Sequence, residues 1–391
     1  MIYLLYTNFY TMTDENSNRQ IYSIASGHLI HDFFTSFLAP LLPSLMDHLS
    51  INLTTAGLLT SLSKLPSIFN PVIGYLADKK GSRYFVIFAP GITATLMSLI
   101  GTSNSVITLG TLLFFSGMSS TLFHAASPGL VAKASENNTG RGLSLYMAGG
   151  GIGRSLGPLV VVWAVGMWGL DGYYRLMFIG WSVSVILFIQ FRSIVLLPHQ
   201  SHSLRAEIPL FKRFFLPFAL VLILRSALIS SLSTYLPVFM VESGAPLWLA
   251  GTVMSIHEIS GVIGALILGP ISDKVGRTKI LNISMLISSL LIPVFLQARG
   301  WQIFPLLVIL GFFSISTGTI FMALVQDYFQ HHRATGNSIY ILISFLSNAL
   351  MLVVVGHIGD VFGLKIAYLL SSGAALLSIP ALKLLPSRTS V

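Results

Sequence analysis

Long apolar segments recur along the whole chain, and they constrain its fold more than any other feature. A helix needs roughly 20 apolar residues to cross the hydrocarbon core of a membrane. Cutting the sequence at charges, Pro/Gly clusters and polar runs gives twelve such segments: 22–43, 53–76, 83–101, 105–130, 143–166, 174–191, 214–240, 247–271, 279–297, 302–325, 337–358 and 363–385. The sequence therefore predicts an all-α membrane protein with twelve transmembrane helices in a lipid bilayer.

Charged residues are scarce, and their placement indicates a membrane rather than a polyanionic partner. They make up 9% of the chain, against about 25% in a soluble domain. The formal net charge of +9 comes from basic residues in short clusters between the apolar segments, which is how membrane orientation is encoded. We therefore expect no nucleic-acid partner. The chain has no cysteine, which excludes a disulfide framework and a thiolate metal site.

The distribution of Lys and Arg predicts the orientation of the chain. Placing the amino terminus on the cytoplasmic side puts sixteen of the 22 Lys and Arg residues on that side and leaves Arg175, Arg299 and Lys365 outside. We therefore predict a multi-pass protein of the plasma membrane with both termini cytoplasmic. The opening residues, MIYLLYTNFY, lack the basic start of a signal peptide, so no cleavage is expected.

A loop motif occurs at equivalent positions in the two halves of the chain. GYLADKKGSR at 74–83 matches GPISDKVGRTK at 269–279, with Asp78 and Asp273 separated by 195 positions. The longest polar interruption after the amino-terminal tail follows the sixth segment and divides the chain into six plus six. The predicted units are a cytoplasmic tail, a six-helix bundle, a cytoplasmic linker, a second six-helix bundle and a cytoplasmic tail, at 1–21, 22–191, 192–213, 214–385 and 386–391.

The repeated loop resembles the signature loop of the major facilitator superfamily. Its glycines permit a tight turn between two helices, and its aspartate can pair with a basic residue or cap a helix. The resemblance implies two pseudo-symmetric six-helix bundles that rock around a central site. It also implies a cytoplasmic gating role for the loop residues, which are Gly74, Asp78, Gly81, Arg83, Gly269, Asp273, Gly276 and Arg277.

The fifth segment contains YMAGGGIGRSLGPL, residues 146–159. Its Gly153, Gly157 and Pro158 resemble the motif that facilitator exporters carry on this helix, where small residues permit close packing and proline bends the helix. The glycine pair that follows the proline in the full family pattern is absent, because Leu159, Val160 and Val161 come next. The motif favours export without settling it.

Three stretches together resemble the fosmidomycin-resistance branch of that superfamily. They are GHLIHDFFTSFLAPLLPSL at 27–45, SSTLFHAASPGLVAKAS at 119–135, and the glycine-rich stretch of the fifth segment. The fourth-segment phrase departs from the family pattern, since Ala125 and Ala126 replace a Pro-Glu pair. The resemblance implies proton-driven export of small compounds, and it places His124 in the central cavity.

The first segment places ionisable groups where a bilayer disfavours them. On a helix His28 and Asp32 are i and i+4, and His31 lies beside them, so one face presents an imidazole–carboxylate pair with a second imidazole. Such a face can hold a proton near neutral pH. The alternatives are a structural ion pair and a metal site, although three N/O ligands make a poor zinc cage.

Three basic residues, Lys64, Arg154 and Arg225, also fall within apolar segments and must find partners there. We expect Asp32 to pair with Arg154 or Lys64, and Arg225 to pair with Glu258. His257 and Glu258 form either a second titratable centre or a packing pair. The predicted proton-coupling and substrate cavity is therefore lined by His28, His31, Asp32, His124, Arg154, Arg225, His257 and Glu258.

These features predict a secondary active transporter that exports a small organic compound or drug in exchange for protons. A proton-coupled importer of a small metabolite has the same sequence features, and a membrane-embedded metal-dependent enzyme is a weaker alternative. The chain has no G-x-x-x-x-G-K-[ST] phosphate loop, which argues against ATP-driven transport. We expect no cofactor and no bound metal, a small-molecule substrate and protons as partners, and a monomer.

Overall fold

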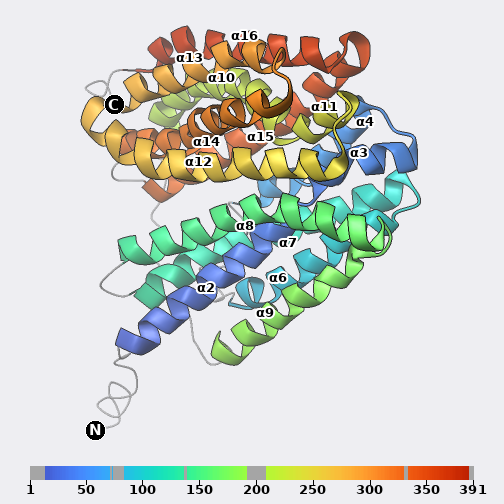
Figure 1. The fold of residues 1–391 in the computed structure, drawn as a ribbon. Coiled ribbons are helices and arrows are strands. Elements are labelled where there is room, and N and C mark those ends of the chain that lie inside the picture. The colour runs from blue at the N-terminus through green and yellow to red at the C-terminus, as the bar shows by residue number, and fades with distance from the viewer. Residues whose placement is uncertain are drawn as a thin grey trace.

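The protein is folded into helices that run roughly alongside one another in two groups (Figure 1). The computed structural model describes residues 14–70, 73, 83–135, 139–191, 208–329 and 333–386. The amino-terminal half contains α2 (Asp14–Thr35), α3 (Leu38–Leu49), α4 (Leu53–Leu62), the 3-10 helix η1 (Leu65–Phe69), α6 (Arg83–Ser98), α7 (Val106–Ser135), α8 (Thr139–Trp168) and α9 (Met177–Phe191). The carboxyl-terminal half contains α10 (Ile208–Ser233), α11 (Leu236–Glu242), α12 (Leu247–Val275), α13 (Arg277–Phe295), α14 (Ile303–Tyr328), α15 (Arg333–Phe362) and α16 (Leu364–Ala381).

The predicted all-α membrane fold is confirmed. Eleven helical stretches of the described chain are long and apolar enough to cross a membrane, and each corresponds to one predicted segment. The remaining segment, 53–76, contains α4 and η1 and continues into residues outside the described part. The ends of the described chain lie on the same side of the molecule, at the left in Figure 1.

The first and seventh predicted spans are broken in the same way. A turn at residues 36–37 separates α2 from α3, and a turn at 234–235 separates α10 from α11. Pro40 has no N–H to donate to the Ser36 carbonyl, four residues earlier. In the same way Pro237 cannot donate to the Ser233 carbonyl. In each half a long helix therefore ends in a short, offset helix at the side away from the termini, which supports the predicted internal repeat.

Glycines on α8 bring its backbone against the backbone of α2. Gly149, Gly153 and Gly157 recur at every fourth position and so share one helix face. A Cβ added at each would collide with α2, at Ala25 O, Leu29 O and Phe33 O respectively. The predicted close-packing role of Gly153 and Gly157 is therefore present in the structure.

The two halves meet mainly along two helix pairs. The opposite side of α8 packs along α12, and α4 packs along α15. At the first contact, Gly251 of α12 faces the Pro158 carbonyl and the Val162 side chain, with no room for a Cβ. Helix α8, which packs against α2, thus also faces the other half of the molecule.

Substitution of Gly153 by Ala should loosen the α2–α8 contact. The added methyl has no room against Leu29 O and Phe33 N, and overpacking of this kind typically costs about 1–3 kcal/mol. We expect a lower midpoint of thermal unfolding for the purified protein. Gly166→Ala on the same helix is the matched control, because a Cβ there meets nothing within 4 Å. Equal shifts for both variants would contradict the packing role.

Candidate functional site

Asp32 of α2 lies at the centre of a buried cluster of charged and titratable side chains. The residue is 3% exposed. His28 Nε2 lies 3.2 Å from Asp32 Oδ2, and His124 Nε2 of α7 lies 3.4 Å from Oδ1. Arg154 Nη1 of α8 donates to Oδ2 at 2.5 Å. Three helices of the amino-terminal half therefore converge on one carboxylate, and the predicted pairing of Asp32 with Arg154 is present.

The two histidines on Asp32 are held by a common tyrosine. His28 Nδ1 lies 2.7 Å from the Tyr146 carbonyl oxygen, and the two rings stack with centroids 3.9 Å apart. The Tyr146 hydroxyl lies 3.4 Å from His124 Nδ1 and 2.5 Å from Ser127 Oγ. Each imidazole is thus held through Nδ1 and presents Nε2 to the carboxylate.

His31 occupies a different environment from His28. Its ring is fully buried and stacks on Phe123 with centroids 4.4 Å apart. It lies edge-on to His124 at 5.4 Å. The second imidazole in contact with Asp32 is therefore that of His124, and His31 packs behind it.

Arg154 connects the two halves of the molecule. Besides its contact with Asp32, its Nε lies 3.9 Å from Glu258 Oε2 of α12. The Arg154 side chain is 43% exposed although it lies in the middle of α8. Because α8 packs along α12 on either side of this position, at Gly151 and Pro158, Arg154 faces the space between the halves.

The predicted pairing of Arg225 with Glu258 is wrong. Glu258 lies next to Arg154, whereas Arg225 of α10 donates from Nε to Thr317 Oγ1 of α14 at 2.6 Å. His257 does not form a centre with Glu258 either, since its Nε2 lies 3.4 Å from Ser314 Oγ of α14. Neighbouring residues on a helix project in different directions, which separates these two side chains.

The second signature loop forms a tight, charged turn. Gly276 joins α12 to α13 with φ 107°, a backbone angle that favours glycine. Arg277 forms an ion pair with Asp273, and its Nε lies 3.3 Å from Asp327 Oδ2 of α14. Its Nη1 also donates to the Gly269 carbonyl at 3.4 Å. The loop thus ties the α12–α13 turn to α14.

The first signature loop lies largely outside the described residues. This applies to Gly74, Asp78 and Gly81. Arg83 begins α6, and its Nη2 donates to the Tyr84 hydroxyl at 3.1 Å. A comparison of the two loops therefore rests on Arg83 alone.

His28, Asp32 and His124 bring three potential metal ligands close together, with donor atoms within 4.8 Å of one another. However, Asp32 Oδ2 is already occupied by the Arg154 guanidinium at 2.5 Å. A divalent cation at this place would be repelled by that permanent positive charge. The donor set therefore fits a proton better than a metal ion.

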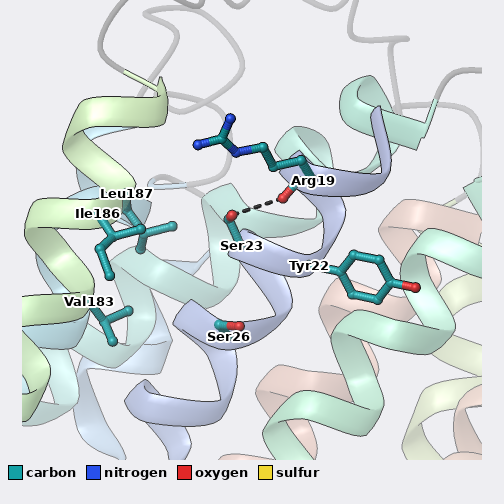
Figure 2. Close-up of a pocket in the computed structure, with 7 residues that line it drawn as sticks. All are labelled: Arg19, Tyr22, Ser23, Ser26, Val183, Ile186 and Leu187. Carbon is teal, nitrogen blue, oxygen red and sulfur yellow. Dashed lines mark hydrogen bonds between the residues drawn. The ribbon is translucent and has the colours of Figure 1, made fainter. Parts of the chain in front are cut away.

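A separate pocket lies between α2 and α9 (Figure 2). Its volume is about 530 Å³, and it is lined by Arg19, Tyr22, Ser23, Ser26, Val183, Ile186 and Leu187. Figure 2 shows the Ser23 hydroxyl donating to the Arg19 carbonyl, at 2.8 Å. The lining residues on α2 precede His28 and the others belong to α9, so the pocket is distinct from the Asp32 cluster.

Polar contacts close the molecule at the end away from the termini. Asp360 of α15 accepts hydrogen bonds from the backbone N–H groups of Leu53 and Thr54, both at 2.8 Å, and from the Thr54 hydroxyl. Its carboxylate thereby caps the first turn of α4, which belongs to the other half. We call this contact between Asp360 and the start of α4 the α4 cap.

Tyr235, at the break between α10 and α11, reinforces the same junction. Its hydroxyl lies 2.5 Å from the Leu352 carbonyl of α15 and 3.3 Å from the Leu53 carbonyl of α4. Gly57 and Gly356 flank this hydroxyl, and a Cβ at either would lie 2.5 Å from it. No motif in the sequence marks Asp360, whereas the proline after Tyr235 marks the helix break.

A family model now decides the class of protein. The model of the Major Facilitator Superfamily matches residues 24–352 and 249–390. The chain belongs to this superfamily. This facilitator is therefore a multi-pass membrane transporter and not an enzyme.

Curated relatives of this facilitator include resistance proteins. The chain is 22% identical over 359 residues to the fosmidomycin resistance protein of Escherichia coli K12, covering 88% of this chain and 87% of the relative. It is 28% identical over 298 residues to the multidrug resistance protein MdtG of Salmonella dublin, covering 71% and 72%. The predicted resemblance to the fosmidomycin-resistance branch is confirmed.

Solved structures support the same fold. A bacterial homologue of the lysosomal transporter Spinster, in an inward-facing and unoccupied conformation, gives a TM-score of 0.75 at 12% identity and covers 96% of this chain and 99% of that one. A D-xylose-proton symporter gives a TM-score of 0.75 at 14% identity, with 95% and 98% covered. At these identities the likeness concerns the fold.

Removal of the Asp360 charge should weaken the closure of the facilitator. Asp360→Asn removes the negative charge from the α4 cap, which is worth about 0.3–1 kcal/mol at a helix N-terminus. At the upper value the open population rises about fivefold. The chain contains no cysteine, so a single Ser61→Cys at the α4–α15 contact can report opening through its rate of maleimide labelling. We expect faster labelling in the Asp360→Asn background.

Asp171→Asn is the matched control for this measurement, because Asp171 is exposed beyond the end of α8. It should label at the rate of the Ser61→Cys parent. An unchanged rate in Asp360→Asn would mean that the α4 cap does not hold the closure.

Proposed function

We propose that this facilitator exports a small organic compound in exchange for protons, with the Asp32 cluster as the proton site. The observation that carries the proposal is a carboxylate within a membrane helix, in contact with two imidazoles and one arginine. Ionisable groups inside a membrane protein are costly and mark substrate or proton pathways.

The geometry of His28 supports a bound proton at this site. Its Nδ1 faces a carbonyl oxygen, which can only accept, so Nδ1 carries a hydrogen. In a neutral imidazole Nε2 would then be a lone pair, 3.2 Å from a carboxylate oxygen. Two acceptors at this distance repel each other unless one proton lies on His28 or on Asp32. One proton shared by the pair satisfies both atoms.

Arg154 supplies a way to couple that proton to substrate. When Asp32 is ionised, its charge holds the Arg154 guanidinium at 2.5 Å. Protonation of Asp32 removes this attraction and leaves Arg154 to Glu258 of the other half, 3.9 Å away, or to a substrate. Proton binding in one half is thereby linked to contacts across the space between the halves.

Two observations support export as the direction. The curated relatives named above are resistance proteins, and the close-packed Gly153, Gly157 and Pro158 resemble the exporter motif on this helix. The excess of basic residues supports cytoplasmic termini in the plasma membrane. In that orientation the α4 cap lies at the outer end of the molecule.

Neutralisation of Asp32 should abolish proton-driven export. Asp32→Asn removes the titratable carboxylate while keeping its shape. We expect cells with the wild-type protein to accumulate less fosmidomycin than cells with an empty vector, and cells with Asp32→Asn to match the empty vector. The measurement is accumulation at matched membrane expression, with and without a protonophore.

Asp47→Asn is the control, because Asp47 is exposed at the end of α3. It should export like wild type. Higher accumulation with wild type than with the vector would identify import instead. Export that persists in Asp32→Asn with the protonophore present would remove Asp32 from the coupling mechanism.

A further inference from the structure

Arg225 is a buried cation that no described carboxylate neutralises. The residue is 8% exposed on α10. Its Nε donates to Thr317 Oγ1 at 2.6 Å, and its Cζ lies 5.5 Å from the Phe321 ring centroid. Among the ion pairs of the described residues, those of the carboxyl-terminal half involve Glu258, Asp273 and Asp327, and none involves Arg225. A guanidinium in a membrane interior requires an opposite charge, a carbonyl or a water-filled cavity.

The free end of this guanidinium is not completely enclosed by the protein. Its two terminal nitrogens make no hydrogen bond to the described residues, yet neither is among the fully buried polar atoms that lack a partner. Gly318 lies beside them, and a Cβ added there would come into ordinary van der Waals contact with Arg225 Nη2 at 3.7 Å and with the Tyr340 hydroxyl at 3.9 Å. Arg225 is thus anchored through Nε and offers its terminal N–H donors to a ligand.

The charges in the membrane interior leave an excess of one positive charge. The cations that the sequence places inside the spans are Lys64, Arg154 and Arg225, and the carboxylates are Asp32 and Glu258. Both carboxylates lie at Arg154. No ion pair of the described residues involves Lys64 or Arg225, and in the carboxyl-terminal half the described partners of Arg225 are the Thr317 hydroxyl and the Phe321 ring.

We propose that Arg225 binds an anionic group of the transported compound, so that the substrates are organic anions. The planar guanidinium can donate two parallel hydrogen bonds to a carboxylate, phosphonate or sulfonate. Thr317 fixes its plane through Nε, which leaves the Nη side for the ligand. This inference rests on the proposed function, since it names the substrate class of the transport cavity.

Binding to the purified protein tests the proposal without any gradient. Full-length protein in lipid nanodiscs is titrated with phenylphosphonate, benzoate or neutral benzamide, and binding is followed by calorimetry. We expect saturable binding of the two anions and none of benzamide. Arg225→Gln should weaken anion binding by about tenfold or more. Arg175→Gln is the control, because Arg175 is an exposed arginine near the end of α8.

Thr317→Val keeps the test decisive if Arg225→Gln does not fold. It leaves the charge in place and removes the hydroxyl that orients it, so anion affinity should fall severalfold. Two results would overturn the proposal: no saturable binding of either anion to wild type, or equal affinity in wild type and both variants. Binding is measured without a proton gradient, so a failure of proton-driven export leaves this result interpretable.

Discussion

The membrane interior tolerates charge only where the protein supplies a partner, and the contact between Asp32 and Arg154 meets this constraint. The glycines of α8 let it approach α2 backbone to backbone, and Arg154 of the same helix reaches Asp32 at 2.5 Å. The same helix then packs along α12 and brings Arg154 within 3.9 Å of Glu258. The helix that carries Arg154 therefore packs on both sides, and Arg154 links the Asp32 cluster to the other half.

Much of this arrangement follows from the sequence. Apolar length predicted the spans, and the i, i+4 spacing of His28 and Asp32 predicted their contact. The partner of Arg225 was predicted wrongly, because a sequence places charges within spans but does not give the rotation of each helix about its axis. On α12 that rotation turns Glu258 toward α8 and His257 toward α14.

The contacts that close the far end could not be predicted for a different reason. Asp360 follows the eleventh predicted span and resembles an ordinary interfacial charge, while its partners are backbone N–H groups more than 300 positions earlier. Tyr235 likewise bonds to two carbonyl oxygens. Backbone groups occur at every residue and carry no sequence signal, so contacts between a side chain and a distant backbone become visible only in the folded chain.

The hydrogen bonds at this end of the molecule affect how readily the transporter changes conformation. The α4 cap and the Tyr235 hydroxyl add hydrogen bonds to a buried apolar cluster that spans both halves and includes Leu53 and Leu352. A hydrogen bond broken in water is replaced by a bond to water, so each contributes only about 0.5–1.5 kcal/mol net. These hydrogen bonds therefore add only a modest amount to the free energy of opening. A transporter must return to its starting conformation in every cycle, and polar contacts that water can replace do not trap it in one conformation.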